Sequence, residues 1–164
     1  MIIQTRLFGE IEIEEEKLLT FPSGLVGMPH LKRFILLDRE EDSPFRWMQS
    51  LNDPSIAFLT LEPQVFRSDY HVMVQQEEVA HLGITEETET LVLCIVTLYR
   101  EPKTLTANLQ GPLVINVEKR QGKQVILLEN QYTPRHDILQ EIGHGRGDRH
   151  GEPEGNVLEL KQGR

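Results

Sequence analysis

One uninterrupted apolar run dominates the sequence. Residues 91–99 read LVLCIVTLY and are rich in β-branched side chains. Such side chains pack well on a pleated surface, and the run is shorter than the roughly ten residues expected of a buried helix, so it favours a strand. Because apolar and polar residues do not alternate within it, the run predicts a central strand that is covered on both faces. A chain with such a strand needs further strands to pair with its edges.

Other short apolar segments, separated by Gly, Pro, Asn and Asp, can supply those strands. The expected strands are 2–8, 10–13, 33–37, 45–50, 56–61, 113–117 and 124–128. Gly9 is expected to join the first two in a hairpin. The polar segment 118–123 is expected to join the last two, with Gly122 available for a positive φ.

Helical signals are few. Residues 75–82 predict a short helix that ends at Gly83, and a second helical turn is expected at 85–88. Short strands in this number, with so little helix, predict a mainly β fold. We expect a small closed or partly open antiparallel β-barrel with one or two short helices.

The composition changes at Gly143. Five glycines fall within residues 143–155, which contain almost nothing to bury. We therefore expect one folded domain over residues 1–142 and a flexible glycine-rich tail over residues 143–164. Within that tail, residues 157–161 (VLELK) would form a strand where an open sheet edge is offered to them.

Charge and cysteine content narrow the class of protein. Seventeen basic residues against 26 acidic ones give a net charge of −9, which argues against direct nucleic-acid binding. No apolar run is long enough to span a membrane, and the amino terminus lacks a signal-peptide pattern. The single cysteine, Cys94, excludes an internal disulfide and fits a reducing cytoplasm.

The residues offer little chemistry. Cys94 lies in the most apolar segment, where burial would leave its thiol inert, and the histidines lack the spacing of a tight metal site. The alternating glycines 143, 145 and 147 have no strand before them and no helix after them, so they are no dinucleotide fingerprint. We therefore expect no enzymatic activity, no catalytic residue, no metal site and no cofactor.

Acidic side chains offer a different role. Glu10, Glu12 and Glu14 alternate with Ile11 and Ile13, so a strand would project them to one side as a negative row. Such a row would speed the encounter with a basic partner. The plainer interpretation of most acidic runs here is a solvated face.

Several segments, in collinear order over residues 1–139, resemble the flagellar assembly factor family FliW. They are MIIQT at the start, FPSGLVG at 21–27, FRWMQS at 45–50, PSIAF at 54–58, TLTANLQGPLVIN at 104–116, RQGKQV at 120–125 and YTPRH at 132–136. This chain departs from the family in two places. Ser68 stands where proline often precedes the Asp-Tyr pair, and the tail is longer.

The resemblance implies a cytoplasmic adaptor with two protein partners. One is flagellin before export, and the other is the translational repressor CsrA, which silences flagellin messenger RNA. The implied mechanism is partner exchange: once flagellin is secreted, the freed factor captures CsrA and relieves repression, and it does so allosterically. Neither direct nucleic-acid binding nor membrane association is expected.

Two loops and the acidic row are the candidate partner-binding sites. In loop 62–70, Phe66 and Tyr70 are possible aromatic anchors beside acidic groups, although core packing is an equally good interpretation of both rings. The second loop spans residues 108–111. The complete set of candidates is Glu62, Phe66, Asp69, Tyr70, Asn108, Gln110, Glu10, Glu12 and Glu14.

A flavin-binding or other small-ligand split barrel is the competing class, because such folds also combine many short strands with few helices. The chain lacks the cluster of basic residues that a phosphate-bearing cofactor requires. Its densest basic group, which includes Lys119, Arg120 and Lys123, falls in the expected 118–123 turn.

Overall fold

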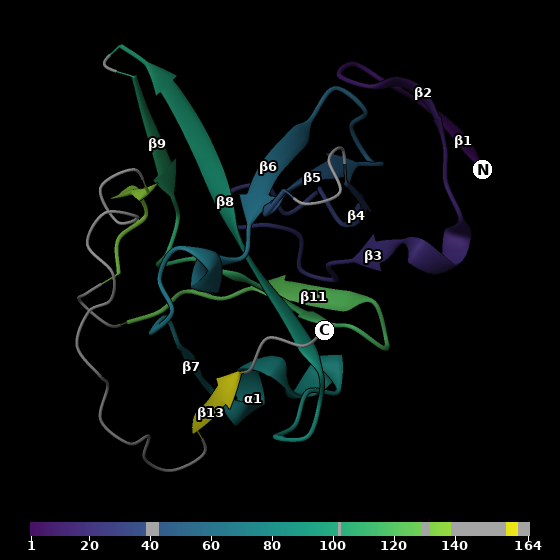
Figure 1. Cartoon of the computed structure of the whole chain (residues 1–164). Coiled ribbons are helices and arrows are strands. Elements are labelled where there is room, and N and C mark those ends of the chain that lie inside the picture. Colours follow the sequence, from purple (N-terminus) through teal and green to yellow (C-terminus); the bar gives the residue numbers. More distant parts are fainter. Residues whose placement is uncertain (39–42, 102, 129–131, 139–156, 161–164) are drawn as a thin grey trace.

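The structure, a computed structural model, describes residues 1–38, 43–101, 103–128, 132–138 and 157–160. A nine-stranded sheet is the main element of the fold. The strand order is β10-β11-β3-β4-β5-β6-β8-β9-β12, and β10 also pairs with β8. That extra pairing closes the strands from β10 to β8 into a ring (Figure 1). The predicted mainly β fold is confirmed, with a ring-like sheet.

The strands are short except for β8. The described strands are β1 Ile2–Thr5, β2 Gly9–Glu12, β3 Leu19–Thr20, β4 Arg33–Leu37, β5 Phe45–Ser50, β6 Ala57–Leu61, β7 Val72–Gln75, β8 Thr90–Arg100, β9 Lys103–Ala107, β10 Leu113–Asn116, β11 Gln121–Gln124, β12 His136–Asp137 and β13 Val157–Leu160. Neighbouring strands in the ring run antiparallel apart from β11 and β3, which meet in parallel at Gln121 and Thr20.

Strand β8 corresponds to the long apolar run, and it separates two hydrophobic cores. Leu93, with the half-buried Leu91 and Ile95, packs with Phe21 and Phe34 in one cluster. The alternate residues Val92, Cys94 and Val96 pack in the other cluster, with Tyr70 and Tyr132 among its members. Coverage on both faces is therefore confirmed up to Val96. Beyond that residue the strand emerges into solvent, where Leu98 is 53% exposed.

The helical elements are shorter than predicted. Helix α1 (Gln76–Val79) continues as the 3-10 turn η3 (Ala80–Leu82), and together they fill the expected helix 75–82. Gly83 has φ +74° and donates its N–H to Ala80 O, which confirms it as the stop. The expected helical turn at 85–88 is a hydrogen-bonded turn instead, in which the Thr85 and Thr88 side chains satisfy local groups. Two 3-10 turns, η1 (Glu15–Lys17) and η2 (Pro63–Val65), were not anticipated.

The hairpin after β10 differs from the expected one. Its second strand is 121–124 rather than 124–128, and the residue with positive φ is Arg120, at +58°, rather than Gly122. Gly122 is buried in β11, where a Cβ atom would lie 2.8 Å from Phe21 Cζ and 3.0 Å from Ile115 Cγ1. The glycine therefore serves close packing, not turn geometry.

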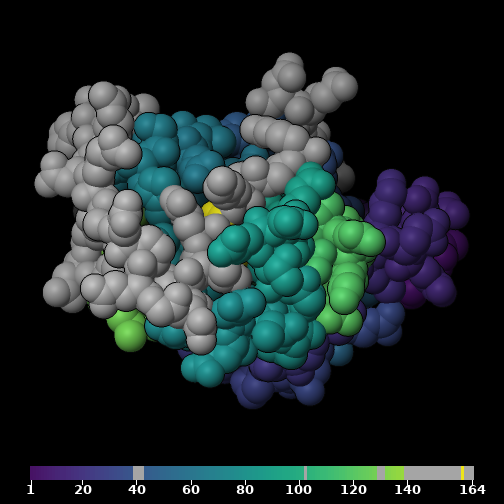
Figure 2. Space-filling view, turned by 90° about the horizontal axis from the view of Figure 1, so that it is seen from below, coloured from purple at the N-terminus to yellow at the C-terminus, as the bar shows by residue number. Residues whose placement is uncertain are grey.

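Two small sheets lie outside the ring. Strands β1 and β2 form the predicted hairpin, with Gly9 at φ +69° opposite Thr5. Figure 2 shows this N-terminal segment as a purple lobe at the edge of the molecule. The second sheet pairs β7 with β13, so the strand expected at 157–161 is confirmed as 157–160. The rest of the predicted flexible tail, and its boundary at residue 142, lie outside the described residues.

Within the described residues, no helix is both long and apolar enough to cross a membrane.

We predict that Gly122→Ala lowers the free energy of unfolding by about 1–3 kcal/mol, because the added methyl group overpacks the site against Phe21. Denaturant unfolding measures the change. In a Phe21→Leu background the same substitution should cost less, since the ring atom nearest the new methyl is gone. An equal cost in both backgrounds would refute the packing explanation.

Burial raises the pKa of Cys94 from 9.0 to about 12, and the polar contact with the Tyr70 side chain offsets part of that rise. Above about pH 9 the thiol ionises in the unfolded chain but stays protonated in the folded one, so stability falls as pH rises. Relative to Cys94→Ala, the wild-type free energy of unfolding should drop by about 1.4 kcal/mol between about pH 8 and pH 10. Urea titrations at both pH values test this, and parallel behaviour of the two proteins would contradict it.

Candidate functional site

The two loops singled out from the sequence lie together. The Tyr70 hydroxyl, at the end of loop 62–70, donates a 2.6 Å hydrogen bond to the carbonyl of Leu109 in loop 108–111. The Tyr70 and Tyr132 rings lie 4.6 Å apart, and the His71 N–H donates to the Tyr132 hydroxyl at 3.3 Å. The two loops are therefore joined at Tyr70 and Leu109, and residues 62–70 and 108–111 are together called here the paired-loop surface.

The aromatic candidates face inward on this surface. Tyr70 is 1% and Phe66 8% exposed, and both belong to the larger hydrophobic cluster. Core packing, the alternative interpretation of these rings, describes their position in this structure. The loop instead exposes Val65, at 57%, which sequence reasoning missed because a lone valine in a 3-10 turn carries no distinguishing signal.

The carboxylate of Asp69 is held in place rather than projecting freely. Its Oδ1 lies 3.3 Å from Arg67 Nε, and both side chains are close to 10% exposed. The Arg67 guanidinium also lies 5.4 Å from the centre of the Tyr132 ring. Because a partly buried ion pair leaves an uncompensated charge when one member is removed, Asp69 contributes to the shape of the loop as well as to its charge.

The second loop is stabilised by its own amide groups. Asn108 Oδ1 accepts the Gly111 N–H at 2.8 Å, as expected for an asparagine that caps a loop. Gln124 Nε2 donates to the Gly111 carbonyl at 2.9 Å, and Gln110 O accepts the Leu127 N–H. The half-buried side chain of Gln110 therefore sits on a backbone that is fixed on both sides.

The acidic row is split between two elements. Glu10 and Glu12 are exposed on β2, opposite Gln4 and Ile2 of β1, and so project to the same side. Gln4 Nε2 donates to Glu10 Oε1 at 2.8 Å. Glu14 lies beyond the strand, where it precedes η1 and pairs with Lys17 at 3.4 Å. Two of the three predicted carboxylates thus share one side of the N-terminal hairpin.

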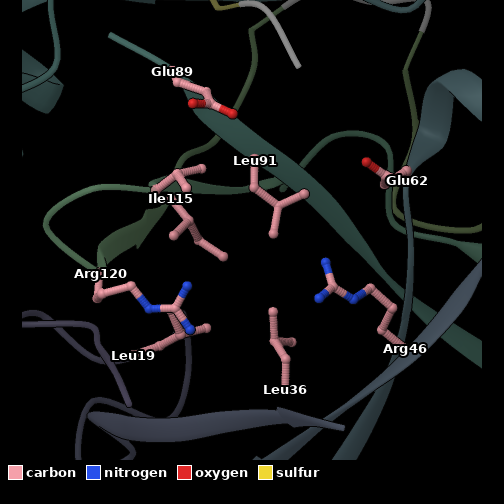
Figure 3. A pocket seen from close by; sticks show the side chains of 9 residues that line it. Leu19, Leu36, Arg46, Glu62, Glu89, Leu91, Ile115 and Arg120 are labelled. Atoms are coloured by element: carbon pink, nitrogen blue, oxygen red, sulfur yellow. The ribbon is translucent and has the colours of Figure 1, made fainter. Parts of the chain in front are cut away.

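Glu62 lies beside a cavity of about 250 Å³. Figure 3 shows Arg46 and Arg120 pointing into this cavity from opposite sides, with Leu36 and Leu91 between them. Burial, and then repulsion from Arg46, lower the pKa of Arg120. Arg120 Nη2 donates to the Lys17 carbonyl at 2.7 Å, whereas the buried Arg120 Nε has no hydrogen-bond partner. Glu62 and Glu89 also line the cavity, so the formal charges of its two arginines and two glutamates sum to zero.

The cavity does not suit the competing flavin interpretation. Ligand pockets usually enclose about 300–1,000 Å³, which is more than this cavity offers. Its two arginines are matched by two glutamates, so the lining provides no net positive charge for a phosphate. Nor do the described residues contain a group of three or more side chains able to hold a metal ion. Two of the six histidines, His144 and His150, lie outside the described residues.

Three comparisons identify proteins similar to this chain. The sequence profile described as FliW protein matches residues 2–138. A flagellar assembly factor FliW from Leptospira interrogans is 40% identical over 139 residues, which cover 84% of this chain and 93% of that protein. The protein of the same name from Geobacter sulfurreducens is 35% identical over 146 residues, covering 89% and 91% respectively.

The structural comparison agrees with the sequence comparisons. A crystal structure described as that of the flagellar assembly factor FliW superimposes with a TM-score of 0.75 at 38% identity. The superposition covers 84% of this chain and 96% of the other. Since the profile spans most of the chain and several relatives exceed 30% identity over that span, the chain belongs to the FliW family.

Proposed function

We propose that this chain is a cytoplasmic flagellar assembly factor that binds flagellin before export and antagonises CsrA by partner exchange. The observation that carries the proposal is membership of a family whose curated members are named flagellar assembly factors. Two features of the described residues support a role in protein binding: the two loops joined by the Tyr70–Leu109 hydrogen bond, and the exposed acidic hairpin. The thiol of Cys94 is buried and therefore not accessible to a substrate.

The charge of the chain supports the CsrA part of the proposal. A repressor that grips RNA must present basic residues, and this chain carries a net charge of −9. Opposite charges accelerate the encounter of the two proteins, whereas the same negative charge repels RNA. Binding of this factor would therefore disfavour an RNA-bound repressor even if the two sites on CsrA did not overlap, which is the form of coupling that an allosteric antagonist requires.

Partner exchange requires that flagellin and CsrA exclude one another on this chain. A specific protein interface buries about 1,600 Å² in total, or about 800 Å² on each partner. Two such interfaces would occupy about 1,600 Å² of the 9900 Å² of accessible surface on this chain. Exchange therefore requires that the two interfaces overlap or are coupled through the structure, which the competition experiment below tests.

The acidic hairpin yields a specific prediction. The double variant Glu10→Lys and Glu12→Lys should lower the association rate constant for CsrA about 3- to 10-fold at low salt, because it reverses the local potential that steers the encounter. The difference should vanish in about 1 M salt, where the screening length falls to about 3 Å. Stopped-flow fluorescence measures both rates.

A matched control separates local from overall charge. Glu86 and Glu87 are also exposed, and Glu86→Lys with Glu87→Lys changes the net charge by the same amount. This control should slow association less than the hairpin variant. Equal slowing by the two double variants would show that the hairpin is not where the encounter is steered.

A three-way competition tests the proposal as a whole. Purified factor, CsrA and flagellin are mixed in pairs and then together, and gel filtration separates the complexes. Each partner should form a complex with the factor alone, and excess flagellin should release CsrA from it. A stable complex of all three proteins would contradict exchange, and failure of the factor to bind either partner at micromolar concentration would contradict the proposed function.

A further inference from the structure

Strand β13 pairs with an edge of the family domain although it lies outside the segment that the family profile matches. The profile ends at residue 138, whereas β13 begins at Val157. Leu158 lies opposite Val74 and Leu160 opposite Val72 in an antiparallel pair (Figure 1). The strand is thus an addition that this chain makes to the matched domain.

The edge of β7 has the properties of a strand-docking site. Val72 and Val74 point into the larger hydrophobic cluster and hold the strand in place, at 1% and 5% exposure. Within the described residues β13 is the strand that pairs with β7, and β7 belongs to a separate two-stranded sheet outside the nine-stranded one. A strand edge presents backbone N–H and C=O groups that any added strand can use.

A side-chain pocket accompanies this edge. Leu160 is 5% exposed and is seated among Pro63, Tyr70, Val72 and Val92. With Leu160 in place the remaining space is about 10 Å³, barely enough for one water molecule. Backbone pairing plus one filled apolar pocket is the combination by which sheet edges recognise extended peptides.

The added strand is poorly matched to the charge of the domain. Its sequence, VLEL, contains Glu159, and the basic Lys161 follows it directly, so the segment brings no net positive charge to a chain with a net charge of −9. Glu77 follows β7 in α1 and is exposed near the residue that pairs with Val157. A basic extended segment would gain the same backbone bonds and, in addition, a favourable electrostatic attraction.

We propose that the β7 edge is a docking site for an extended segment of a protein partner, and that β13 occupies this edge in cis and competes with it. The partner segment is basic, runs antiparallel to β7 and places an apolar side chain in the Leu160 pocket. Because β13 is tethered to the domain, it acts at a high effective concentration. It raises the apparent dissociation constant of the partner by the reciprocal of the fraction of chains in which β13 is undocked. This inference rests on the proposed function for the identity of the partner.

Two variants of the full-length protein test the inference. Leu160→Asp places a charge in the apolar pocket and should release β13, and Leu160→Ala should do so more weakly. Leu128→Asp is the matched control, because it makes the same chemical change at a side chain that is 91% exposed. Circular dichroism confirms that each variant is folded.

The first measurement does not depend on any partner. A fluorescent peptide with the sequence of residues 155–164 is titrated against each protein and followed by anisotropy. The peptide should bind Leu160→Asp at least about 10-fold more tightly than it binds the wild type or Leu128→Asp, because the edge is vacant only in the first. Failure of the peptide to bind the folded Leu160→Asp variant would overturn the proposal that β13 is displaceable.

The second measurement uses purified CsrA and flagellin. At least one of them should bind Leu160→Asp about 5-fold or more tightly than wild type, with Leu160→Ala in between and Leu128→Asp unchanged. Capture of the peptide combined with unchanged binding of both partners would overturn the docking role of the edge and leave the proposed function intact. Absence of binding by every variant would overturn both.

Discussion

The fold depends on strand β8, which is the longest described strand, pairs on both of its edges and contributes side chains to two cores. Its first half pairs with β10 and its second half with β9, while residues 94–96 pair with β6 on the other edge. Alternate side chains then enter separate hydrophobic clusters. A polar residue in its first half would therefore disturb a core, whichever face it occupied, and would also weaken the closure of the ring.

Closure of the ring decides where function can reside. Once β10 pairs with β8, each strand of the ring has a neighbouring strand on both sides, and buried side chains from these strands pack in the smaller hydrophobic cluster. What remains accessible lies outside the ring: the N-terminal hairpin, the paired-loop surface and the β7 edge. Two described cavities, at about 250–260 Å³, are small and lined by balanced charges or mixed groups, which favours the proposed recognition of partners by surface contact.

The sequence predicted local structure well and spatial relationships poorly. Periodicity and apolar runs located β4, β5, β6, β8 and β10 to within a residue or two, because side-chain alternation is a local property. The sequence around Gly122 predicts a turn residue, whereas the glycine packs closely against Phe21, about a hundred residues earlier, and such a long-range approach leaves no local trace. Likewise, the sequence alone allows Phe66 and Tyr70 to be either interface anchors or core residues, and only the three-dimensional contacts show that both face the core. The acidic hairpin was predicted because it is local, whereas the bond between Tyr70 and Leu109 could not be.

Tyr70 links the regions on which the proposals depend. Its hydroxyl holds the carbonyl of Leu109, and its side chain lines the pocket that Leu160 fills. Any segment that replaces β13 must therefore pack against the same ring that joins loop 62–70 to loop 108–111. A shift of that ring would move a hydrogen bond to a buried carbonyl, and such bonds are costly to leave unmade. The β7 edge and the paired-loop surface thus share Tyr70, which offers a contiguous path between the two proposed partner sites.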